Sequence, residues 1–260
     1  MNLNYKIENE GQTIVLIHGL SDNLEYWQPL TNRLKKKYRI LRYDLRGHGK
    51  SESGNEKIIM DIYTEDLLKL LDKLKIKKAN LIGFSLGGAI ALDFTTRHPE
   101  RVSSLVLMSS FYKSDEYLTK IFTSLKKALK KGFPEFFDSI LPMILCPETI
   151  TEYEEELKMI KNSKEKTANT TAYIQAIDAC INYNIEDKIE NINVPTLILA
   201  GKYDEITLQS TQKALHNQIK NSKIVILDNV KHNLLVGENI DKISNIIENF
   251  IQIDIEHKKS

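Results

Sequence analysis

The sequence predicts an α/β fold, in which a doubly wound, mostly parallel β-sheet carries an inserted helical cap. Three observations lead to this prediction. Short runs rich in β-branched and other apolar residues recur along the chain, and an amphipathic helical stretch follows each of them. The runs are apolar almost throughout instead of alternating, as strands covered by helices on both faces require. The alternation of strand and helix stops only once, in a long central stretch.

Six runs are expected to form strands buried on both faces. They are Thr13–Ile17, Arg39–Tyr43, Ala79–Ile82, Ser104–Met108, Thr196–Ala200 and Lys223–Leu227. Between them, Asp66–Leu74 and Asn239–Ile251 repeat apolar residues with the spacing of one helical face. Only Met1–Glu8 precedes the first run, so a hairpin at the N-terminus would be short or incomplete.

The alternation stops between Phe111 and about Asn191, where no buried strand is expected. Leu118–Leu129 has one apolar helical face and is followed by Gly132, a residue that suits a helix C-cap. Three further helical stretches follow it, namely Pro134–Leu141, Thr151–Asn162 and Thr167–Asn182. We therefore expect residues 1–110 and 192–260 to form the core, and residues 111–191 to form a helical cap over one end of the sheet.

The composition limits the partners of the chain. Its 260 residues include 36 Lys and Arg against 35 Asp and Glu, so the formal net charge is +1. Such a balance gives no electrostatic reason to expect nucleic acid or an anionic membrane as a partner. No segment reads as a signal peptide or a membrane span, and neither Cys146 nor Cys180 has metal-ligand spacing. We expect a cytoplasmic protein with two buried, reduced cysteines and with no metal or cofactor.

A candidate nucleophile lies in the segment Gly83–Gly87, whose sequence is GFSLG. It follows the predicted strand Ala79–Ile82 and opens the helical stretch Leu86–Arg97, which is the context of a G-x-S-x-G nucleophile elbow. Side chains at positions 83 and 87 would clash in so tight a turn, and the helix N-terminus favours developing negative charge. The alternative is a glycine-rich helix start with an incidental serine. The context favours Ser85 as the nucleophile.

A serine hydroxyl needs a base, and the base needs an acid that orients it. In hydrolases with such an elbow, the acid and then the base follow the serine along the chain. Of the six histidines, His232 follows the predicted strand Lys223–Leu227 directly, in a loop at the carboxyl end of the sheet. His216 falls within a predicted helix and His257 in a polar tail. A surface loop histidine is the alternative interpretation of His232.

Asp204 is the candidate acid, because it comes just after the predicted strand Thr196–Ala200. Asp228, which ends the last predicted strand, is its rival, and a solvated loop carboxylate is the plain alternative. The oxyanion needs two N–H donors. We expect them from Leu86, the residue after the nucleophile, and from Leu20, in the loop after the first long strand. His18 is expected to brace this loop.

These motifs resemble those of α/β hydrolases of the esterase and 3-oxoadipate enol-lactonase type, and the likeness runs from about Gly11 to Asn249. The residues that carry it are His18-Gly19-Leu20, Trp27, Asp44–Ser51, Gly83–Gly88, Val194-Pro195-Thr196, Asp204 and His232. In this family Asp44–Ser51 is a structural turn, so Arg46 and His48 receive no catalytic role. The chain departs from the family at Lys231, where a glycine usually precedes the histidine, so the loop that holds His232 is expected to differ in shape.

The resemblance implies a serine hydrolase with the catalytic residues Ser85, Asp204 and His232 and no cofactor. Its expected partner is a small-molecule ester or lactone that is partly apolar, and Phe111 and Phe137 are expected to line the acyl pocket. Carbon–carbon bond hydrolysis and acyl transfer remain alternatives within this fold. A ligand receptor with residual hydrolysis is the alternative from another functional class. The natural substrate and the oligomeric state stay open.

Overall fold

The core of the protein is a seven-stranded sheet in the order β1-β3-β2-β4-β5-β6-β7. The computed structural model describes residues 1–257, with side chains as far as Gln252. The strands are β1 (Tyr5–Glu8), β2 (Thr13–Ile17), β3 (Arg39–Tyr43), β4 (Ala79–Phe84), β5 (Val102–Met108), β6 (Thr196–Gly201) and β7 (Ser222–Leu227). All neighbouring strands are parallel except β1, which pairs antiparallel with β3. The short N-terminal strand and the parallel sheet agree with the sequence analysis.

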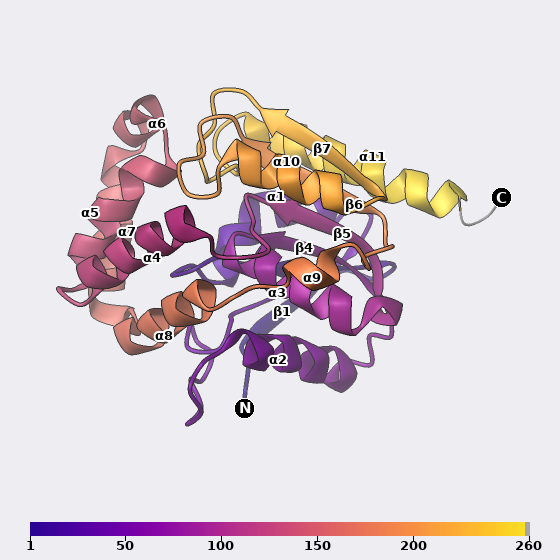
Figure 1. Ribbon diagram of the computed structural model, residues 1–260, viewed down its shortest axis with the longest axis horizontal. Helices are drawn as coiled ribbons and strands as arrows, with labels where there is room; N and C mark the ends of the chain where they lie inside the picture. The colour runs from indigo at the N-terminus through magenta and orange to yellow at the C-terminus, as the bar shows by residue number, and fades with distance from the viewer. Residues whose placement is uncertain (258–260) are drawn as a thin grey trace.

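Helices cover both faces of the sheet, which confirms the doubly wound architecture (Figure 1). On one face lie α1 (Gln28–Leu34) and α11 (Asn239–His257), packed on Ile14 and Leu16 of β2. On the other lie α2 (Met60–Lys73), α3 (Leu86–Arg97) and α10 (Gln209–Gln218), packed on the alternate residues of the same strands, such as Val15 and Ile17. Two single turns of 3-10 helix, η1 (Leu24–Trp27) and η2 (Pro99–Arg101), complete this part. Successive strand residues point to opposite faces, so runs apolar throughout supply both layers.

Six helices are inserted between β5 and β6. They are α4 (Glu116–Leu129), α5 (Phe133–Ile144), α6 (Pro147–Glu152), α7 (Glu154–Thr167), α8 (Thr170–Ile181) and α9 (Glu186–Ile189). Figure 1 shows α4 to α8 gathered beyond one end of the sheet. The chain enters and leaves this insertion through two antiparallel segments, which we call the neck. In the neck, the N–H of Ser114 donates to the carbonyl of Tyr183 at 2.9 Å, and the N–H of Ile185 to that of Tyr112 at 3.0 Å.

Some details differ from the predictions made from the sequence. The strand β7 is not buried on both faces, because it is an edge strand with a single neighbour, and most of its residues are half-buried. Gly132 does not cap α4; its φ of 133° places it directly before α5, where it lets the chain turn between the two helices. Of the two free cysteines, Cys180 is buried but Cys146 is only half-buried.

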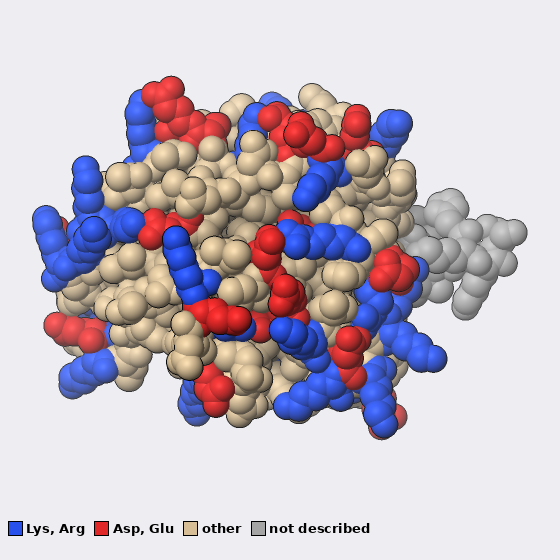
Figure 2. Space-filling model, turned by 60° about the horizontal axis from the view of Figure 1, so that its bottom comes forward, with Lys and Arg blue, Asp and Glu red and all other residues tan. Residues whose placement is uncertain are grey.

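Charges of both signs are interspersed over the face in Figure 2, with uncharged surface between them. This mixed distribution matches the formal net charge of +1 and offers no patch of a single sign on that face. Within residues 1–257, no helix has both the length and the apolar character needed to cross a membrane.

Candidate active site

The turn between β4 and α3 holds Ser85 in a strained conformation. Its φ of 52° and ψ of −116° lie where L-residues are rarely found. A Cβ on Gly83 would lie 2.3 Å from the carbonyl oxygen of Gly87, and a Cβ on Gly87 would lie 2.1 Å from that of Ile17. The two glycines are therefore required by backbone approach, as the motif predicts. The N–H of Ser85 donates to the carbonyl of Met108 at 2.9 Å, which ties the turn to β5.

Two backbone N–H groups beside this turn have no acceptor among the described residues, namely those of Leu20 and Leu86. Leu86 begins α3, so its N–H has no partner within the helix. The N–H of Leu20 belongs to the same peptide group as the carbonyl of Gly19, and in a trans peptide the two point in opposite directions. Two donors expected at an oxyanion site are thus free.

His18 holds the Gly19–Leu20 peptide in place. Its Nδ1 lies 2.8 Å from the carbonyl oxygen of Gly19, and its Nε2 accepts the N–H of Leu45 at 3.0 Å. A carbonyl only accepts and an N–H only donates, so the ring is neutral with its hydrogen on Nδ1. Burial lowers the pKa of His18 to about 3, which keeps the ring neutral near pH 7. The structure places His18 where it braces the loop.

Asp204 and His232 meet at the carboxyl ends of β6 and β7. The Nδ1 atom of His232 lies 2.8 Å from Oδ2 of Asp204. The same carboxylate accepts hydrogen bonds from the N–H groups of Ile206 and Thr207 and from the Thr207 hydroxyl, at 2.7 to 2.9 Å. Burial alone would raise the pKa of Asp204, but the adjacent His232 and these donors hold it below its ordinary value. An ionised Asp204 fixes the ring with Nδ1 as donor and leaves Nε2 as an acceptor.

The rival residues lie in other surroundings. Asp228 is exposed and forms an ion pair with Lys202 at 2.9 Å. The Nδ1 atom of His216 lies 2.8 Å from the hydroxyl of Ser222. His48 is buried, with Nδ1 3.0 Å from the carbonyl oxygen of Arg46. The side chain of His257 is outside the described part of the chain. Of the candidate pairs considered, only Asp204 and His232 come together near Ser85.

The loop before His232 accommodates Lys231 without strain. The positive φ in this loop, 55°, is at Asn229, and Lys231 is not among the residues with positive φ. The Nζ atom of Lys231 donates to the carbonyl of Pro142 in α5 at 2.7 Å and to Oε1 of Glu205 at 2.6 Å. The lysine therefore joins the loops that carry Asp204 and His232 to the inserted helices.

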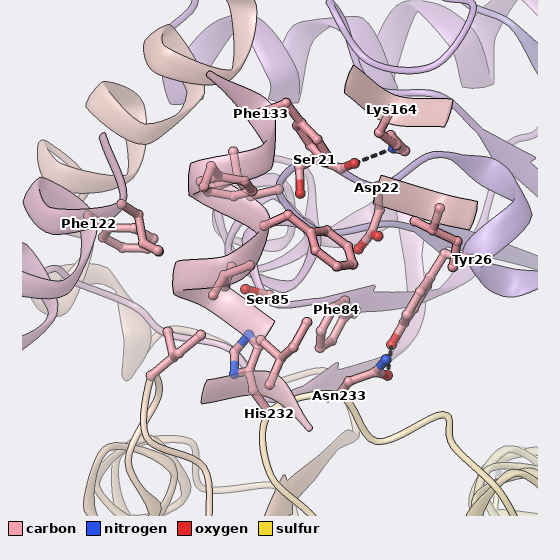
Figure 3. A pocket seen from close by; sticks show the side chains of 18 residues that line it. Ser21, Asp22, Tyr26, Phe84, Ser85, Phe122, Phe133, Lys164, His232 and Asn233 are labelled. Carbon is pink, nitrogen blue, oxygen red and sulfur yellow. Dashed lines mark hydrogen bonds between the residues drawn. The ribbon is translucent and has the colours of Figure 1, made fainter. Parts of the chain in front are cut away.

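A cavity of about 120 Å³ opens onto Ser85 and His232. Its wall is largely apolar and comes from α4, α5, α7 and the loops of the core. The apolar lining residues are Leu20, Phe84, Phe122, Leu125, Phe133, Phe136, Phe137, Ile140, Ile144, Ile160 and Ile206. Figure 3 shows Ser85 and His232 between Phe122 on one side and Asp22, Tyr26 and Lys164 on the other.

Of the two phenylalanines expected in the acyl pocket, only Phe137 lines this cavity. Phe111 is fully buried behind the wall, with its ring 5.6 Å from that of Phe122 and 5.9 Å from that of Tyr183. The expectation for Phe111 is corrected accordingly. It immediately follows the buried run from β5, so it faces the core of the insertion instead of the cavity.

Several lining residues escaped the sequence analysis. Asp22, Tyr26 and Lys164 also line the cavity, as do Ser21 and Asn233. Asp22 could have been predicted from the sequence, because it comes four residues after His18, in the same loop as the expected N–H donor Leu20. No sequence signal pointed to Lys164, because its contact with residue 21 joins segments that lie 143 positions apart. Thr207, which supports Asp204, carried no motif either.

The chain is similar to known hydrolases over most of its length. The family model described as serine aminopeptidase, S33, matches residues 8–239. RutD of Azorhizobium caulinodans, described as a carbamate hydrolase, is 25% identical over 233 residues, which cover 87% of this chain and 86% of RutD. The enol-lactonase of Burkholderia xenovorans LB400 is 26% identical with a TM-score of 0.88, and the match covers 96% of each chain.

The fold is shared more widely. MGS-M2, an α/β hydrolase from a Medee basin deep-sea metagenome library, has a TM-score of 0.89 at 23% identity, with 96% of this chain and 94% of MGS-M2 covered. The family model spans most of the chain, and the neighbours match its sheet and its helices over nearly their whole lengths. The chain is therefore an α/β hydrolase and belongs to the serine aminopeptidase S33 family.

Proposed function

We propose that the chain is a carboxylic-ester hydrolase, which cleaves esters or lactones of small to medium, partly apolar substrates through an acyl-enzyme on Ser85. One arrangement carries the proposal. Ser85 and His232 line one cavity, Asp204 holds the histidine ring at 2.8 Å, and two free N–H groups flank the serine. This combination supplies a nucleophile, an oriented base and an oxyanion site.

In the proposed reaction, Oγ of Ser85 attacks the carbonyl carbon of the substrate while Nε2 of His232 takes the hydroxyl proton. The carbonyl oxygen becomes an oxyanion, which the N–H groups of Leu20 and Leu86 stabilise. When the tetrahedral intermediate collapses, the bond to the alcohol oxygen breaks and His232 gives that oxygen the proton. The acyl group then remains on Ser85.

Water completes the cycle. His232 takes a proton from the water as its oxygen attacks the acyl carbon, and a second oxyanion forms in the same site. Its collapse breaks the bond to Ser85, which regains its proton from His232, and the acid leaves. In a lactone, alcohol and acid are parts of one molecule, so the product is a single hydroxy acid.

The relatives support carbonyl substrates of this kind. An enol-lactonase at 26% identity supports lactones, and a relative described as a carbamate hydrolase supports carbamates as a second candidate class. We also propose that residues 111–191 act as a cap, since α4, α5 and α7 supply Phe122, Phe137 and Ile160 to the cavity. A screen of short esters, lactones and carbamates would rank these classes by kcat/KM.

The decisive experiment is the substitution Ser85→Ala. It is expected to reduce kcat on short p-nitrophenyl esters by about 10³-fold or more, since the members of a triad act as a unit. A fluorophosphonate should label the wild-type protein at Ser85 alone, as peptide mass mapping would show. Full activity in the folded variant, or labelling at another residue, would contradict the proposed mechanism.

A further inference from the structure

The cavity at Ser85 is lined by two charged side chains, Asp22 and Lys164, that form no ion pair with each other. Asp22 lies in the loop after β2 and Lys164 lies in α7, and both line the cavity together with Ser85 (Figure 3). No ion pair joins them within the described chain. Lys164 instead donates through Nζ to the backbone carbonyl of Ser21. Each of the two side chains therefore has bonding capacity directed at the cavity.

The carboxylate of Asp22 accepts no hydrogen bond from any described residue, although it is only half-exposed. Burial raises its pKa to about 6, against the opposing effects of Lys164 and His232. A partly desolvated carboxylate without a hydrogen-bond donor is stabilised when a bound ligand supplies one. We therefore expect Asp22 to accept a hydrogen bond from an N–H or O–H group of the substrate.

The ammonium group of Lys164 is in the complementary situation. It has three donors, of which the carbonyl of Ser21 uses one, and no carboxylate forms an ion pair with it among the described residues. Burial lowers its pKa, while the charges of Asp22 and Asp44 raise it. We therefore expect Lys164 to donate a hydrogen bond to an oxygen of the substrate.

We propose that Asp22 and Lys164 form a subsite for a neutral amide-type group of the substrate, with its N–H donated to Asp22 and its C=O accepting from Lys164. The group is recognised and not cleaved. A neutral amide satisfies both side chains at a smaller desolvation cost than a zwitterion, in a cavity that is otherwise apolar. This subsite rests on the proposed ester hydrolysis, and it narrows the substrate to an ester or lactone with an amide near the scissile carbonyl.

Three ethyl esters of equal chain length separate the two contacts. Ethyl N-acetylglycinate has both the N–H and the C=O, ethyl 4-oxopentanoate keeps only the C=O, and ethyl pentanoate has neither. Acid release gives kcat/KM for each ester, divided by its rate of alkaline hydrolysis to remove intrinsic reactivity. We expect each added contact to raise this value by about 10-fold, the usual effect of a hydrogen bond to a charged group.

The variants are judged by ratios within one protein preparation, so a partly unfolded sample does not change the result. Asp22→Leu should bring the ratio of N-acetylglycinate to 4-oxopentanoate close to one, and Asp22→Asn, which keeps an acceptor oxygen, should restore part of it. Lys164→Met should bring the ratio of 4-oxopentanoate to pentanoate close to one. Lys166→Met, at an exposed position of the same helix, is the matched control and should leave both ratios unchanged.

Ratios near one in the wild-type protein, or ratios that survive Asp22→Leu and Lys164→Met, would overturn the subsite and leave the proposed esterase intact. Failure to hydrolyse any of the three esters in a Ser85-dependent way would overturn the proposed function itself, and the subsite with it. The two failures are thus distinguishable in one experiment.

Discussion

At the scale of single residues, the strained turn at Ser85 depends on Gly83 and Gly87, the glycines two positions before and after it, because a Cβ at either would meet backbone atoms. Gly83 does not adopt a positive φ, so its requirement for glycine is purely steric, whereas Gly237 has a φ of 52° with open space around it. Substitutions at Gly83 and Gly237 therefore test the two effects separately, steric contact at Gly83 and an unfavourable φ at Gly237.

We expect Gly83→Ala to lower the free energy of unfolding by about 2 kcal/mol or more, since its Cβ would lie 2.3 Å from a backbone oxygen. Gly237→Ala, the control, should cost about 1 kcal/mol, because only the conformation is unfavourable. Urea unfolding measures both values. An equal or smaller cost at position 83 would mean that the turn relaxes easily.

The acid and the base are tested by paired substitutions. His232→Ala and Asp204→Asn should each lower kcat/KM on a short ester by about 10²-fold or more, because the first variant lacks the base and the second lacks the carboxylate that orients it. Asp228→Asn should change it little, since that carboxylate is exposed and pairs with Lys202. Steady-state kinetics decide between them, and a loss that follows Asp228 would reassign the acid.

Stability should fall in acid because of two buried histidines. Burial lowers the pKa of both His18 and His48 to about 3, below the ordinary value of 6.5 that they regain on unfolding. Between these two pH values the unfolded chain binds more protons, so the free energy of unfolding decreases as pH falls, by up to about 1.4 kcal/mol per pH unit for each ring. Urea unfolding from pH 7 to 4 should show this slope. His48→Gln should reduce the slope, and an unchanged slope would contradict the assignment.

At the scale of elements, hydrogen bonds fasten the inserted helices to the loops that carry Asp204 and His232. The neck closes the insertion at one place, and Lys231 reaches Pro142 near the end of α5. The N–H of Asn233, next to His232, donates to the carbonyl of Ile144 at 3.0 Å. The sequence predicted α5 as Pro134–Leu141, but it runs from Phe133 to Ile144 with Pro142 inside it. The last carbonyl of the helix, that of Ile144, thus contacts the loop that carries His232.

The wall formed by α4 and α5 should limit acyl length. Each buried CH₂ adds about 0.8 kcal/mol, so kcat/KM on p-nitrophenyl esters should rise roughly fourfold per carbon from acetyl upward and then fall when the cavity is filled. Phe137→Ala should move the maximum to longer chains, since Phe137 lines the cavity. Met159→Ala, 64% exposed on α7, is the control and should keep the maximum in place. A profile that Phe137→Ala leaves unchanged would mean that α5 does not bound the acyl site.

At the scale of the whole molecule, the sequence predicted what depends on local pattern. β2 and β3 have the predicted bounds, and the parallel sheet is confirmed. Ser85, Asp204 and His232 follow the carboxyl ends of β4, β6 and β7 in that order. The pattern predicted Phe137 in the cavity wall but not Asp22 and Lys164, which line the same cavity only after the insertion folds back onto the loop after β2. The prediction for Phe111 was wrong, because its apolar side chain could line the cavity or pack behind the lining residues, and the sequence does not distinguish the two.

The covered site should also decide which acyl donors the whole enzyme accepts. Helices α4, α5 and α7 line the cavity together with Ser85, and its volume of about 120 Å³ is small for an extended peptide chain. With the same p-nitrophenyl leaving group, a butyryl ester should therefore be cleaved with a kcat/KM at least about 10²-fold above that of a blocked tripeptide ester, a difference of about 3 kcal/mol in transition-state stabilisation. Ser85→Ala gives the background rate for both esters. If the tripeptide ester reacted as fast as the butyryl ester and the reaction depended on Ser85, the inserted helices would have to move aside during turnover, and the peptidase activity in the family's name would become the better description of the site.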